Sequence, residues 1–156
     1  MSLVHLHLLL NHVPVVGTLF ALLLFAATIY PRETVSTRFA LGFSAAIAVV
    51  AVAVYFTGGA AEVAVEKLAG VTERAIEQHQ EAAEVTTVAM SIFGALSLAA
   101  LAIFRKRQMP RWVGVTGLAG TVALSALMGW TANLGGQIRH TEIRSANLQQ
   151  GGNAED

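Results

Sequence analysis

Five histidines are the residues of this chain with the most distinctive chemistry, and they stand at positions 5, 7, 12, 79 and 140. Imidazole nitrogens ligate haem iron, zinc and copper, and they exchange protons near neutral pH. The chain contains no cysteine, which excludes disulfides, iron–sulfur clusters, thiolate zinc sites and covalently attached haem. Any cofactor must therefore be held by histidine, methionine or oxygen ligands.

The composition is that of a protein surrounded by lipid. Hydrophobic residues make up 54% of the 156 residues and charged residues only 13%. A soluble domain carries about 25% charged residues, because its surface must be solvated. The formal net charge of zero argues against a nucleic-acid partner, which would favour a basic surface. The sequence thus predicts an integral membrane protein whose main partner is the lipid bilayer.

Four apolar segments are long enough to cross a bilayer, which takes about 20 residues. They run over residues 6–30, 39–57, 85–104 and 112–134. Glycine and alanine recur within them, as close packing of helices in lipid requires. We therefore predict an all-α fold, an integral membrane four-helix bundle over residues 1–144, followed by a disordered tail over 145–156.

Basic residues in short loops predict the orientation, because such loops stay in the cytoplasm. Arg32 and Arg38 flank the first loop, and four basic residues lie between positions 105 and 111 in the third. The middle connection is rich in glutamate instead. This pattern predicts a multi-pass protein of the bacterial cytoplasmic membrane, with both termini and all five histidines on the extracytoplasmic side.

Depth counting places ligand-type side chains of all four spans in one layer. At 1.5 Å per residue, His5, His79 and His140 lie about 39–43 Å from the nearest cytoplasmic arginine. Glu62 and Glu66 lie about 36–42 Å from theirs. Helix bundles build cofactor sites from side chains on facing helices in this way.

The first segment carries a deeper histidine. His12 lies among apolar residues, and ionisable groups at membrane depth are functional candidates. In a straight helix His5 and His12 share one face, since seven residues are nearly two turns, while His7 points elsewhere. Pro14 is tolerated only in a first turn or at a kink.

A faint internal repeat relates the two halves of the chain. Residues 55–59 and 130–136 both contain an aromatic residue and a double glycine at the outer end of a span. This similarity suggests two helical hairpins related by a pseudo-twofold axis along the membrane normal.

The preferred interpretation is a membrane b-type cytochrome, because haem b needs two axial imidazoles on different helices. His79 and His140 have matching depths, and His5 or His12 would face them. One haem is expected, and a second haem would need all four of the histidines at positions 5, 12, 79 and 140 as ligands. Arg139 and Arg144 could pair with its propionates. The protein would pass electrons between an extracytoplasmic redox partner and the quinone pool or a larger respiratory complex.

Two alternatives remain open. A copper, zinc or di-iron centre could use His12, His79, His140, Glu62 and Glu66, although the Glu-x-x-His spacing of di-iron bundles does not occur. The chain could also be a non-haem accessory or anchor subunit, whose small residues suit contacts with other subunits or with a second copy. In each case an electron-transfer or accessory role is favoured over an independent enzyme.

Several segments resemble a known group of proteins. Residues 5–17, with His12-Val-Pro14, and residues 57–66, 76–84 and 135–144 are similar to small bacterial four-helix membrane proteins of unknown function. That group resembles short b-type membrane cytochromes with a His-Pro or His-x-Pro element early in the first helix. The resemblance implies a b-type haem protein in which His12, His79 and His140 are the matching histidines.

Overall fold

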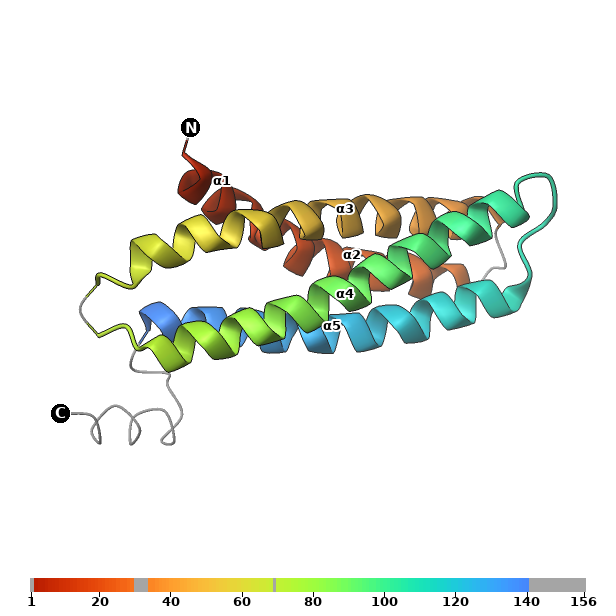
Figure 1. Ribbon diagram of the computed structural model, residues 1–156. Helices are drawn as coiled ribbons and strands as arrows, with labels where there is room; N and C mark the ends of the chain where they lie inside the picture. Colours follow the sequence, from red (N-terminus) through yellow and green to blue (C-terminus); the bar gives the residue numbers. More distant parts are fainter. Residues whose placement is uncertain (1, 30–33, 69, 141–156) are drawn as a thin grey trace.

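A computed structural model describes residues 2–29, 34–68 and 70–140 of the chain. In this part of the chain all regular structure is helical (Figure 1). The predicted tail over 145–156 and Arg144 lie outside the described residues. The helices, in chain order, are α1 (Leu3–Leu10), α2 (His12–Ile29), α3 (Thr34–Val65), α4 (Glu73–Ile103) and α5 (Arg111–Arg139).

The four predicted spans are confirmed as four helices long and apolar enough to cross a membrane, with α1 and α2 together forming the first. Their many large apolar side chains on the outside fit a lipid environment; Val49, Leu96 and Ile103 are 70%, 63% and 69% exposed. The helices extend well beyond the apolar segments. They also continue through Gly58 and Gly135, so the double glycines do not end them.

The first span is interrupted at Asn11, between α1 and α2, although Asn11 keeps helical backbone angles and its N–H bonds to the carbonyl of His7. Pro14 lies in the first turn of α2, where its missing N–H does little harm. In a regular helix the ring of Pro14 would clash with the carbonyl of Leu10 in the preceding turn, so proline disfavours regular helix there.

Helices α2, α3, α4 and α5 form a closed bundle, in which α3 packs on α4, α4 on α5, α5 on α2 and α2 on α3. The described chain begins with α1 and finishes with α5 at the same end of the bundle (Figure 1). The opposite end is closed by Arg38, whose guanidinium donates hydrogen bonds of 2.8 Å to the carbonyls of Phe104 and Arg107. The two ends of the bundle thus differ: hydrogen bonds of Arg38 join the segments at one end, and the other end is available for a site.

The described residues form three apolar clusters, of which two fill the middle of the bundle and its Arg38 end. The one nearer the Arg38 end includes Phe25, which is fully buried, and Val113. The middle cluster consists of Ile47, Ala51, Met90, Leu124 and Met128. Between helices the contact is close where glycine removes a side chain, and Gly117 of α5 lies directly against the Phe25 ring.

Gly117→Ala should destabilise the bundle by about 1–3 kcal/mol, as overpacking of a core does. A β-carbon at this position would lie 2.6 and 2.7 Å from Cδ1 and Cζ of Phe25, which has no free space to move into. Gly129→Ala is the matched control on the same helix, since its β-carbon meets nothing within 4 Å. Thermal unfolding in detergent should show a lower midpoint for Gly117→Ala only, and equal midpoints would contradict this packing.

Candidate cofactor site

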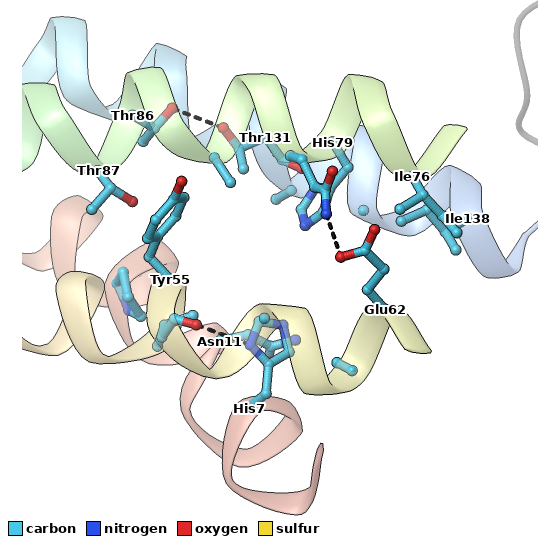
Figure 2. A pocket seen from close by; sticks show the side chains of 18 of the residues that line it. His7, Asn11, Tyr55, Glu62, Ile76, His79, Thr86, Thr87, Thr131 and Ile138 are labelled. Atoms are coloured by element: carbon cyan, nitrogen blue, oxygen red, sulfur yellow. Dashed lines mark hydrogen bonds between the residues drawn. The ribbon is translucent and has the colours of Figure 1, made fainter. Parts of the chain in front are cut away.

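A cavity of about 900 Å³ lies at the end of the bundle where α1 begins and α5 finishes. This volume is within the range of about 300–1,000 Å³ that small-molecule and cofactor sites occupy. Residues of all five helices line it, and Figure 2 shows side chains from α3 and α4 pointing into the space between them. Exposed lining residues such as Glu77 and His140 place its opening at the end of the bundle.

Polar groups are concentrated in this cavity. Tyr55 stands in it with its hydroxyl directed towards α4 (Figure 2). The ionisable side chains that line it are His7, His12, His79, His140, Glu62, Glu77, Glu81, Glu84 and Arg139. Four of the five histidines therefore gather at one site, as the depth count predicted in outline.

His79 projects from α4 and is held by α5. Its Nδ1 lies 3.1 Å from the carbonyl oxygen of Thr131. A carbonyl can only accept, so Nδ1–H is the donor, and in the neutral ring Nε2 keeps its lone pair. This is the arrangement that orients a metal-ligating histidine, with one nitrogen bonded to the protein and the other free for a ligand.

A buried hydroxyl pair fixes the part of α5 that holds His79. The Thr131 hydroxyl lies within hydrogen-bond distance of the carbonyls of Leu127, at 3.0 Å, and Ala82, at 3.2 Å. The hydroxyl of Thr86 lies 2.8 Å from that of Thr131. Because these bonds join α4 to α5 next to the imidazole, they restrict its movement.

His7 projects from α1 and is held by α3 in the same manner. Its Nδ1 lies 3.1 Å from the carbonyl oxygen of Val54 and 3.3 Å from the hydroxyl of Thr57. That hydroxyl itself donates to the Val54 carbonyl at 2.8 Å, so it accepts from the imidazole. His7 therefore also carries its proton on Nδ1 and leaves Nε2 available.

The two histidines occupy equivalent positions in the two hairpins. Each bonds to the carbonyl four residues before a glycine, Val54 before Gly58 and Thr131 before Gly135. A helical side chain covers the turn preceding its own Cα, so a glycine uncovers the carbonyl of that turn. A β-carbon at Gly58 would lie 3.6 Å from Cε1 of His7, and one at Gly135 would lie 2.9 Å from Cε1 of His79.

This equivalence gives the double glycines of the sequence repeat a physical role. They admit an imidazole to the helix backbone and so fix the tautomer of His7 and His79. The two rings reach into the cavity from opposite walls (Figure 2). A cofactor between them would meet two neutral imidazole nitrogens with free lone pairs, carried by different helices.

Most of the residues predicted from the sequence lie at the cavity. His12, His79, His140, Arg139 and Glu62 line it, and Glu62 accepts a hydrogen bond from Gln80 across its rim. Two predicted residues, His5 and Glu66, are not among the described lining residues; both are exposed, and the ring of His5 bonds to Ser2. Arg144 lies outside the described residues.

His7 is the site residue that sequence reasoning missed. The prediction that His5 faces the site with His12 while His7 points elsewhere differs from the observed lining, because His7 and His12 line the cavity and His5, nearer the start of α1, bonds to Ser2. The contact of His7 with Gly58, like that of His79 with Gly135, is visible only in the structure, because the two histidines stand at different separations from their glycines along the chain.

The predicted metal centre finds no support in this geometry. Within residues 2–29, 34–68 and 70–140, no three His, Asp or Glu side chains lie close enough to hold a metal ion together. The arrangement offers two opposed imidazoles and a large cavity instead. Comparison of the chain with protein-family models, curated proteins and solved structures finds no match, so the geometry of this cavity is the basis for assigning a function.

Proposed function

We propose that this protein binds one haem b in the cavity between His7 and His79 and works as a membrane electron carrier. The observation that carries the proposal is the matched pair of imidazoles, each with Nδ1–H bonded to a backbone carbonyl and Nε2 available. Haem iron with two histidine ligands needs such a pair on different helices. Bound haem would supply one-electron reduction and oxidation of its iron.

Three further features fit a flat, partly apolar cofactor. The volume of about 900 Å³ suits a large ligand. Apolar and small residues line the deeper part, among them Val15, Ala51 and Met128. Arg139 stands at the mouth, where it could pair with carboxylate groups of the cofactor. The residues that would hold haem are thus His7 and His79 as ligands and Arg139 as an anion partner.

An optical spectrum of the purified protein in detergent tests the proposal. After reconstitution with haemin and reduction by dithionite, we expect the sharp α and Soret bands of a bis-imidazole haem. The double variant His7→Ala/His79→Ala should lose them, while His5→Ala should keep them, because His5 bonds to Ser2 outside the cavity. A protein that takes up no haemin, or a double variant with an unchanged spectrum, would make the haem proposal untenable.

We further propose that the cavity opens to the extracytoplasmic side of the bacterial cytoplasmic membrane. The exposed basic residues Arg105, Lys106, Arg107 and Arg111 lie at the opposite end of the bundle, and such residues favour the cytoplasm. A phosphatase that is active only outside the cytoplasm should therefore be active when fused after the last residue. Activity of a fusion at position 108 instead would reverse this orientation.

The proposed placement suits the exchange of electrons with partners outside and within the membrane. A haem near the extracytoplasmic surface could exchange electrons with a redox protein on that side and with the quinone pool or a larger respiratory complex within the membrane. Gly42 and Gly129, whose added β-carbons would meet nothing within 4 Å, leave room on the outside for a neighbouring helix. A role as a haem-bearing subunit is therefore compatible with the same site.

A further inference from the structure

The two ligating histidines differ in how firmly the fold holds them. His79 belongs to the 31-residue helix α4 and lies between the buried residues Ile76 and Ala82. His7 belongs to the eight-residue helix α1, in which none of the residues Leu3–Leu10 is buried. His7 and His79 thus make equivalent hydrogen bonds to the backbone, but the helix that carries His7 is less buried than the helix that carries His79.

Helix α1 is attached to the bundle along one side only. It packs mainly against α3. Its leucines Leu3, Leu8 and Leu9 are 57%, 57% and 62% exposed and none of its residues is fully buried, so its apolar contact with the bundle rests on half-buried residues such as Leu6 and Leu10. The polar hydrogen bonds of His7 to Val54 and Thr57 are the specific contacts that join it to the bundle.

A hinge lies directly after α1. Asn11 keeps helical backbone angles and its N–H bonds to the carbonyl of His7, but Pro14 has no N–H for the carbonyl of Leu10, so the helix hydrogen bonds that would stiffen the first span are interrupted at this turn. A β-carbon added at Gly58 would lie 3.6 Å from the His7 ring, an ordinary contact, whereas one added at Gly135 would lie 2.9 Å from the His79 ring, so His79 packs more closely against its glycine. Movement about the hinge would therefore withdraw His7 and leave His79 in place.

We infer that α1 is a hinged arm and that His7 is the exchangeable imidazole of the pair, which a small neutral diatomic ligand such as carbon monoxide replaces. The inference rests on the proposed haem function and assigns the site a second capacity, the binding of small neutral ligands on the His7 side. His79 is the permanent ligand. Ligand exchange involves no net oxidation or reduction, and the displaced imidazole stays attached to the arm.

Distances between spin labels can follow the arm, because the chain has no cysteine of its own. Leu9→Cys reports on α1, and Asn133→Cys reports on an exposed position of α5 outside the cavity lining. In the full chain in lipid nanodiscs we expect a broad distance distribution without haemin and a single narrow one with haemin. Reduction followed by carbon monoxide should broaden it again.

The label pair Val63→Cys/Asn133→Cys is the matched control, since both positions are exposed on long helices, and it should give one distribution throughout. If haemin binds with a bis-imidazole spectrum but the Leu9 distances are the same in all three states, the hinged arm is wrong and the haem function stands. If carbon monoxide leaves both spectrum and distances unchanged, the exchange is wrong. If haemin does not bind, the proposed function fails and the exchange with it.

Discussion

Replacing His79 by alanine is expected to lower the affinity for haemin by at least about 100-fold, more than the loss of a ligand's hydrogen-bond partner usually costs. His79 is the imidazole that α4, Thr131 and Gly135 hold most firmly. Without it, His7 on the short helix α1 would be the remaining ligand of the pair. Titration of the detergent-solubilised protein with haemin, followed by the Soret absorbance, measures the effect.

Free imidazole separates loss of a ligand from loss of the fold. Excess imidazole should restore part of the bis-imidazole spectrum in His79→Ala, because the space of the missing ring can admit it. The thermal midpoint of the haem-free variant should stay near that of the parent, since the Thr131 carbonyl keeps its place in α5. An unchanged haemin affinity in His79→Ala would show that this histidine is no ligand.

Gly135→Ala should lower the affinity for haemin by about 10–100-fold, the cost typical of disturbing the partner of a metal ligand. The new methyl group would lie 2.9 Å from Cε1 and 3.2 Å from Nδ1 of His79, so the ring must move away from the Thr131 carbonyl. Electron paramagnetic resonance of the oxidised protein should report the altered ring orientation.

The stability of the same variant distinguishes positioning from folding. In a helix interior alanine is favoured over glycine by about 0.5–1 kcal/mol, so haem-free Gly135→Ala should unfold at an equal or higher temperature. Gly58→Ala and Gly59→Ala are controls in α3. The first makes only an ordinary contact of 3.6 Å with His7, and the second meets nothing within 4 Å. Equal losses of haemin affinity in all three variants would argue against a role special to Gly135.

The number of spans could be predicted because hydrocarbon imposes a simple requirement, a run of apolar residues about 30 Å long. Where the helices stop could not, because the outer turns of α3, α4 and α5 are polar and are stabilised by packing on one another around the cavity. Glycine pairs that would end a helix in isolation lie inside α3 and α5, where bundle contacts outweigh their low propensity.

The location of the site was predictable, but its ligand pair was not. Counting along straight helices brings ligand-type residues to one end, and His12, His79 and His140 do line one cavity there. His7 lines this cavity and His5 does not, a difference that counting depths along the chain did not show. The bond from an imidazole to a backbone carbonyl of another helix depends on a close approach that spacing along the chain does not reveal.

The middle apolar cluster has a consequence for the passage of ions along the bundle axis. Ala51 and Met128 form part of the cavity wall, and Ile47, Met90 and Leu124 continue the same cluster along the bundle axis. An ion would have to give up its water to pass between these side chains, at a large electrostatic cost. This cluster therefore opposes the passage of ions along the bundle axis below the cavity, so a reaction at the cavity mouth would not need to open an ion path through the protein.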